Sequence, residues 1–137
     1  MANARHVEVV KELYRAFQEG DVQALLGCLT DDVVFTMPSM PGVPLKTSYR
    51  GKKGVQKFLR DRAPVLRYTR FEPLRYFSDQ DSVLVRGETA GRVLTTGRSF
   101  RYKWIQVFDF GQNNRIHSFH ELLDTHVLVR AFARQAK

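Results

Sequence analysis

The sequence predicts an α+β domain in which a curved antiparallel sheet wraps around three N-terminal helices. Apolar residues recur at helical spacing in the first half of the chain, whereas β-branched and aromatic residues alternate after Pro64. Short turn signals separate the alternating runs, and connections this short require antiparallel neighbours. Because the chain has 137 residues and no internal repeat or flexible linker, we expect one domain spanning residues 1–137.

Caps and stop signals delimit the three helices. The first carries its apolar residues on one face and ends before Gly20, and Asp21 is placed to cap the second. A strand and a proline-rich loop separate the second helix from the third, which ends near Pro64. The expected ranges of the helices are 5–19, 22–29 and 51–62, with the strand at 33–37.

The remaining strands are expected to form a meander. Polar and glycine-containing turns at 78–81, 96–97 and 111–114 punctuate the alternating pattern. The expected strand ranges are 67–77, 82–90, 99–110 and 115–124, and a terminal helix or arm covers 125–137.

Charge and cysteine content narrow the class of protein. A net charge of +8 suggests a nucleic-acid partner, but the sequence has no helix-turn-helix, zinc-finger or RNP-like pattern. We therefore expect a solvated basic face and keep nucleic-acid binding only as the last alternative. The single cysteine, Cys28, lies in an apolar stretch, is expected in the core, and fits a reducing compartment. With no signal peptide and no apolar run near the ~20 residues of a membrane span, we expect a cytoplasmic protein without a membrane partner.

One face of the strand expected at 99–110 is almost entirely aromatic. Its alternate residues are Phe100, Tyr102, Trp104, Gln106, Phe108 and Phe110. Such a face fits either a large core or the wall of a small-molecule pocket with a single amide in it.

The closing strand supplies the ionisable groups. Glu121 alternates with Phe119 and Leu123, and a carboxyl group buried among such neighbours acquires a raised pKa, as a general acid or base requires. An ordinary ion pair with a basic side chain is the alternative. Asp124 has the opposite parity and joins the site only if a bulge or the strand end turns it inward.

Two other groups of residues have ordinary explanations. Arg86 and Glu88 fit a charged pair inside a cavity, a surface pair or an interface. The four histidines lack a metal-ligand spacing, so no metal site is expected.

Several local motifs resemble one known family. They are Glu19-Gly20-Asp21, Asp31-Asp32-Val33-Val34-Phe35 before Pro38, Tyr49-Arg50-Gly51, Thr95-Thr96-Gly97-Arg98, Asn114-Arg115-Ile116 and Phe119-His120-Glu121-Leu122-Leu123-Asp124-Thr125. Over about residues 7–131 the chain resembles the SnoaL-like, ketosteroid-isomerase-related branch of the nuclear-transport-factor-2-like superfamily. The resemblance implies a cone-shaped α+β domain with a deep apolar cavity, usually a homodimer, working without a metal or an organic cofactor.

Two enzymes of this superfamily resemble the chain only in part. By this resemblance, the base, tyrosine and oxyanion aspartate of ketosteroid isomerase would fall near Met37, Leu13 and Gln106, so that acid/base set is not expected here. The water-activating carboxylate of limonene epoxide hydrolase falls on Glu121. Its tyrosine and asparagine fall near Phe35 and Met37. Its arginine and aspartate fall near Gly87 and Thr89, unless a slip of one residue restores Arg86 and Glu88.

The leading hypothesis is a cofactor-free acid/base enzyme of isomerase or cyclase type acting on a small apolar oxygenated molecule. Glu121 would move the proton and Gln106 would bind a substrate oxygen, with Asp124 as a further catalytic candidate. The expected substrate-binding residues are Tyr14, Phe35, Met37, Tyr49, Tyr102, Trp104, Phe119 and Leu123. A non-catalytic ligand-binding or dimerisation module and an epoxide hydrolase are the alternatives.

A homodimer is the expected assembly. A half-covered antiparallel sheet leaves its outer face to be buried, and Ile105, Val107 and Leu122 provide apolar positions on that face.

Overall fold

The computed structural model describes residues 3–134, and within them four α-helices, one 3-10 turn and six strands form an α+β fold. The helices are α1 (Ala4–Glu19), α2 (Val22–Gly27), α3 (Gly51–Arg62) and α4 (Thr125–Phe132), and the 3-10 turn is η1 (Gln112–Asn114). The strands are β1 (Leu29–Thr36), β2 (Ser48–Arg50), β3 (Leu66–Ser78), β4 (Ser82–Val93), β5 (Ser99–Phe110) and β6 (Ile116–Leu123). The fold class predicted from the sequence is confirmed.

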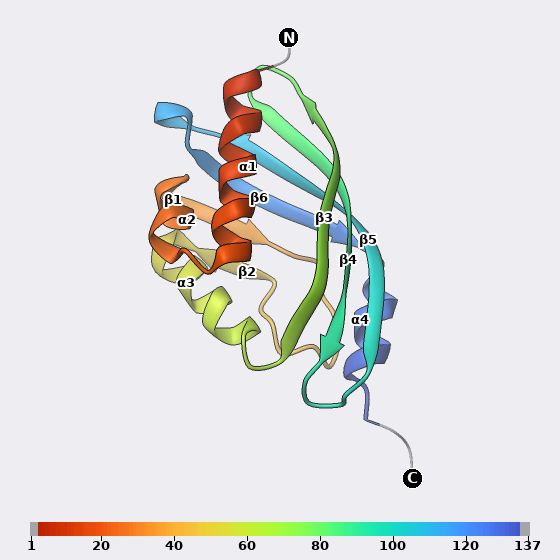
Figure 1. The fold of residues 1–137 in the computed structure, drawn as a ribbon. Coiled ribbons are helices and arrows are strands. Elements are labelled where there is room, and N and C mark those ends of the chain that lie inside the picture. Colours follow the sequence, from red (N-terminus) through yellow and green to blue (C-terminus); the bar gives the residue numbers. More distant parts are fainter. Residues whose placement is uncertain (1–2, 135–137) are drawn as a thin grey trace.

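The six strands form one curved sheet in the order β2-β1-β6-β5-β4-β3 (Figure 1). The predicted meander is confirmed, because β3, β4, β5 and β6 pair consecutively and antiparallel. The prediction of an antiparallel sheet is wrong at one pairing: β1 and β6 run parallel, with Phe35 opposite Phe119. Much of the chain lies between these two strands, so no hairpin forces them into opposite directions.

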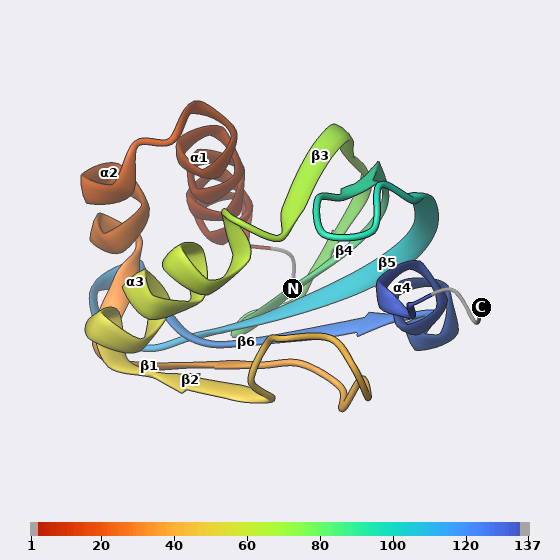
Figure 2. The ribbon, with the colours of Figure 1, turned by 90° about the horizontal axis from the view of Figure 1, so that it is seen from below.

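Helices α1, α2 and α3 cover one side of the sheet, which bends around them (Figures 1 and 2). Two glycines of β4 contribute to this packing because aromatic rings of β5 lie where their side chains would stand. A Cβ atom on Gly87 would lie 2.2 Å from Cζ2 of Trp104, and one on Gly91 would lie 2.8 Å from Cζ of Phe100. Strand β3 also carries two irregularities in its register, which strengthen the local twist.

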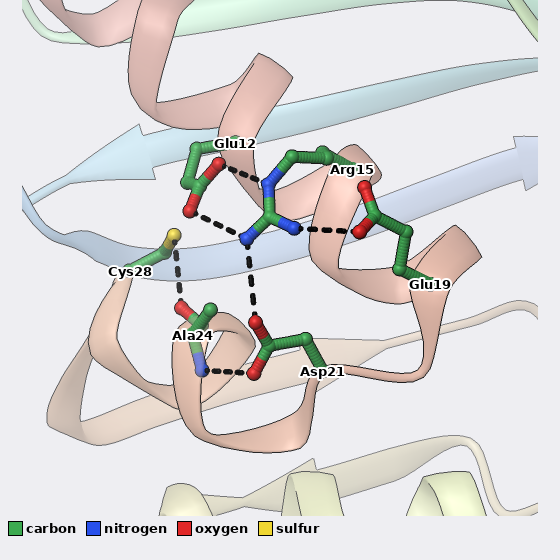
Figure 3. A network of polar contacts seen from close by, with 6 residues as sticks. All are labelled: Glu12, Arg15, Glu19, Asp21, Ala24 and Cys28. Carbon is green, nitrogen blue, oxygen red and sulfur yellow. Dashed lines mark hydrogen bonds and ion pairs between the residues drawn. The ribbon is translucent and has the colours of Figure 1, made fainter.

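The junction of α1 and α2 follows the predicted signals. Gly20 ends α1 in the left-handed conformation with φ of 70°, and the side chain of Asp21 accepts a hydrogen bond from the backbone of Ala24 over 3.1 Å. Figure 3 shows the guanidinium of Arg15 in contact with three carboxylates. They are Glu12, Glu19 and Asp21, at 2.6, 3.1 and 3.4 Å. Arg15 thereby connects α1 to the residue that caps α2.

At the edges of the fold, one strand differs from the sequence expectations and one helix agrees with them. Strand β2, which pairs with β1, was not predicted. Helix α4 forms within the segment expected as a helix or arm, whose residues 135–137 lie outside the described part of the chain. No helix among residues 3–134 is both long enough and apolar enough to cross a membrane.

Candidate active site

The first three helices and the facing strands enclose a cavity of about 70 Å³. Its wall is apolar or aromatic except for Gln106 and Glu121. The lining residues are Leu13, Tyr14, Phe17, Leu25, Phe35, Met37, Val55, Phe58, Leu59, Tyr68, Phe71, Gln106, Phe119 and Glu121.

Three polar side chains are connected through hydrogen bonds at this cavity. The Tyr14 hydroxyl of α1 donates to Oε1 of Gln106 over 2.8 Å, and Nε2 of Gln106 donates to Oε2 of Glu121 over 2.9 Å. Gln106 and Glu121 are direct partners in the ladder between β5 and β6. Because Tyr14 occupies the amide oxygen, the amide nitrogen of Gln106 is directed to the carboxyl group.

The environment of Glu121 makes its proton exchangeable near neutral pH. Burial disfavours the carboxylate and raises its pKa from 4.5 to about 7, although the hydrogen bond from Gln106 acts in the opposite direction. The Glu121 side chain lines the cavity, and the residue is therefore only partly buried. No described residue donates a hydrogen bond to its second oxygen, Oε1.

The tyrosines near the cavity act as hydrogen-bond donors rather than as bases. Burial raises the pKa of Tyr14, Tyr68 and Tyr102 above that of an ordinary tyrosine, so all three stay protonated at neutral pH. The hydroxyls of Tyr68 and Tyr102 lie 3.5 Å apart, and the Tyr68 ring lines the cavity while Tyr102 stands behind it.

Six of the residues singled out in the sequence meet at the cavity. They are Tyr14, Phe35, Met37, Gln106, Phe119 and Glu121. The alternation of β5 and β6 places Gln106, Glu121 and Phe119 there, and β1 contributes Phe35.

The other candidates lie elsewhere. The Tyr49 hydroxyl donates to Asp61 over 2.9 Å, and Trp104 packs behind the wall with its indole N–H donating to Thr89 over 2.7 Å. Leu123 is partly buried opposite Trp104 in the ladder. Asp124 caps α4 by accepting from the backbone of His126 over 3.2 Å, as it follows the end of β6.

Sequence reasoning missed most of the wall contributed by helices and by β3. The apolar faces of α1, α2 and α3 supply the lining residues Leu13, Phe17, Leu25, Val55, Phe58 and Leu59. Tyr68 and Phe71 both line the cavity although strict alternation places them on opposite faces. The shift in register between Tyr68 and Arg70 explains this.

The charged pair considered for an epoxide hydrolase does not enter the cavity. Arg86 is exposed, and Glu88 lies 3.7 Å from Arg70, which in turn pairs with Glu72. The inward positions of β4 carry Gly87 and Thr89. The indole of Trp104 fills the space that a side chain at Gly87 would need. The slip that would restore both charges is therefore absent.

Neither metal ligands nor an activated thiol are present in the described part of the chain. Residues 3–134 hold no group of three or more His, Cys, Asp or Glu side chains placed to bind a metal ion. Burial raises the pKa of the Cys28 thiol to about 11, and its sulfur donates to the carbonyl of Ala24. Such a thiol stays protonated and suits the core.

The amino-acid sequence of the chain matches a known family model. The model of the SnoaL-like domain matches residues 10–119. The chain belongs to the SnoaL-like family. No curated protein sequence matches this SnoaL-like domain significantly.

Solved structures share the fold over almost the whole SnoaL-like domain. An NTF2-like protein from Burkholderia xenovorans LB400 is 26% identical, with 97% of this chain and 99% of that chain covered and a TM-score of 0.85. TerC, crystallised with polyporic acid, is 20% identical, with 93% and 98% covered and a TM-score of 0.84. A protein from Xanthomonas campestris, provisionally named a polyketide cyclase, is 18% identical, with 95% and 98% covered and a TM-score of 0.80.

Proposed function

We propose that this SnoaL-like domain is an acid/base enzyme that moves a proton on a small apolar oxygenated molecule, in an isomerisation or a cyclisation. The observation that carries the proposal is the Glu121 carboxyl group at the wall of an apolar cavity, with a pKa of about 7. A group with this pKa is present in both protonation states at neutral pH, so it can accept a proton and return it. The named relatives with the same fold, TerC with polyporic acid and the provisional cyclase, support a small organic substrate.

The three connected side chains have distinct roles in this proposal. Oε1 of Glu121 takes a proton from a carbon next to a substrate carbonyl and returns it at another atom. Gln106 positions Glu121 through one N–H, and its second N–H is available to the substrate oxygen that gains negative charge. Tyr14 holds the amide in this orientation. Proton transfer of this kind requires no metal or organic cofactor.

The size of the cavity restricts what can react there. Sites for drug-sized ligands measure roughly 300–1,000 Å³. A cavity of about 70 Å³ therefore admits the reacting end of a molecule and excludes a bulky polycyclic body.

The test uses a compact ketone whose isomerisation needs only one proton to leave one carbon and one to reach another. Cyclohex-3-enone converts to cyclohex-2-enone in this way, and in heavy water the product acquires deuterium. We expect turnover by the unmodified chain and a loss of about 10²- to 10⁴-fold in Glu121→Gln. The matched control is Glu8→Gln, because Glu8 is an exposed carboxylate of α1.

Two results would contradict the proposal. One is equal turnover by Glu121→Gln and the unmodified chain. The other is the absence of both conversion and deuterium exchange across a panel of enolisable ketones while the chain binds small apolar ketones.

That second result would favour a non-catalytic ligand-binding module. The observation behind this alternative is that Tyr14, Gln106 and Glu121 are already hydrogen-bonded to one another within a small cavity. Epoxide hydrolysis has less support, because only Glu121 remains of the polar groups that the resemblance implies for it.

A further inference from the structure

Arg62, in the last turn of α3, is a cation packed against two aromatic rings. Its guanidinium carbon lies 4.7 Å from the ring centre of Phe17 and 4.3 Å from that of Tyr68. Its Nε atom is buried and makes no hydrogen bond to any described residue. Such contacts stabilise a guanidinium, and they leave the Nε–H of Arg62 without a hydrogen-bond acceptor among the described residues.

No carboxylate of the described residues lies within 4.0 Å of Arg62, although an acid precedes it in the chain. Asp61 is engaged elsewhere, because Lys57 and the Tyr49 hydroxyl both contact its carboxylate, at 3.0 and 2.9 Å. The guanidinium of Arg62 is therefore a partly desolvated charge whose counter-ion the described chain does not provide.

The position of Arg62 relates it to the cavity. Arg62 lines a hollow of about 280 Å³ whose wall shares three residues with the inner cavity: Phe17, Tyr68 and Phe71. The two spaces are therefore adjacent along these aromatic side chains. The second cation of the hollow, Arg70, is already paired with Glu72.

We propose that Arg62 binds the anionic group of an apolar organic acid, preferably a carboxylate, whose uncharged end enters the cavity beside Glu121. The cavity holds only the reacting end of a molecule, and the hollow lined by Arg62, which shares three wall residues with the cavity, is an adjacent space for the remainder. A planar carboxylate matches the paired donors of a guanidinium. This inference shares with the proposed function only the premise that the ligand enters the cavity.

Calorimetric titration with two matched probes tests it. The probes are 3-phenylpropanoate and its neutral amide, 3-phenylpropanamide, which differ in charge but hardly in shape. We expect the acid to bind the unmodified chain about tenfold more tightly than the amide, and Arg62→Gln to abolish that preference. Arg60→Gln is the matched control, because Arg60 is exposed on the same helix and its loss changes the net charge equally. It should retain the preference.

A second measurement does not depend on the folding of a variant. In the unmodified chain, the acid should shift the side-chain Nε–H resonance of Arg62 in ¹⁵N–¹H spectra, and the amide should not. Equal affinity for the two probes, failure of both to bind at millimolar concentration, or a preference that survives in Arg62→Gln would overturn the proposal.

The variant Glu121→Gln separates this proposal from the proposed function. It should keep the preference for the acid, because Arg62 is intact. Normal turnover of cyclohex-3-enone by Glu121→Gln would refute the proposed proton transfer by Glu121. It would not contradict the proposed anion site at Arg62. Loss of the acid preference only in Arg62→Gln supports the anion site whatever the fate of the catalytic proposal.

Discussion

Gln106 and Glu121 face each other across the antiparallel strands β5 and β6, and the amide Nε2 lies 2.9 Å from the carboxyl Oε2. Direct ladder partners on one face of a sheet are close enough for such contacts. The pairing keeps a carboxyl group inside an apolar cavity, where burial raises its pKa to about 7.

Glu121 should make the protein less stable as the pH rises. Its pKa is raised from 4.5 to about 7 in the folded state, so between these values the folded chain binds a proton that the unfolded chain has lost. The contribution to the free energy of unfolding is full below the lower value and is lost as the pH passes the upper one, by about 3 kcal/mol at most. In Glu121→Gln this pH dependence should disappear. Urea unfolding followed by fluorescence of Trp104, the single tryptophan, measures it, and parallel pH profiles for both proteins would refute the assignment.

Removing the Tyr14 hydroxyl should raise the pKa of Glu121 further. Without this donor the amide of Gln106 is free to turn its oxygen toward Glu121, which favours the protonated carboxyl. Tyr14→Phe should also lower the free energy of unfolding by about 1–2 kcal/mol. Carbon NMR of the Glu121 carboxyl at varied pH provides the pKa. Tyr76→Phe is the control, because its hydroxyl makes no hydrogen bond to a described residue; an equal shift in both variants would contradict the role of Tyr14.

Gly87→Ala should be strongly destabilising. Its Cβ atom would lie 2.2 Å from the indole of Trp104 and 2.6 Å from the backbone oxygen of Glu72. Neither the indole ring nor the backbone oxygen can move away easily, so we expect a loss of about 3 kcal/mol or more in the free energy of unfolding. Gly27→Ala is the matched control: it lies in α2 with open space around it and should be neutral or stabilising, by about 0.5–1 kcal/mol. Similar stability of the two variants would show that β4 and β5 are not packed as described.

The homodimer remains a prediction, now with a defined surface. Ile105 and Leu122 face each other on the outer side of β5 and β6, and their exposed fractions are 37% and 48%. Sedimentation equilibrium should give twice the chain mass of 15.9 kDa for the unmodified protein and a shift toward the monomer for Leu122→Lys. Leu94→Lys, at an exposed apolar residue outside the strands, should remain dimeric. A monomeric unmodified protein would refute the assembly.

Much of the fold was predictable because its signals are local. Gly20 and Asp21 mark the end of one helix and the start of the next, and turn residues delimit the meander. The parallel pairing of β1 with β6 depends on residues far apart in the chain, and no local pattern encodes it. Strand β2 is three residues long and follows a proline-rich loop, so it shows no alternation.

The residues of the candidate site were predictable only on strands in which inward-facing and outward-facing residues alternate strictly. Gln106 and Glu121 lie on the inward phase of β5 and β6, as expected. Trp104 also faces inward on β5, but the cavity borders only part of the aromatic face of this strand and does not reach Trp104. Phe71 and Arg62 were not assigned to a site, because a shift of register directs the first and helix α3 positions the second.

The parallel contact of β1 with β6 also sets an order of events during synthesis. A chain emerging from the ribosome exposes β1 first, while its neighbour β6 appears only after β2, β3, β4 and β5. Until then one edge of β1 has no backbone partner, and such edges invite pairing with other chains. The nascent chain is therefore prone to pairing with other chains until β6 has been synthesised and has joined β1.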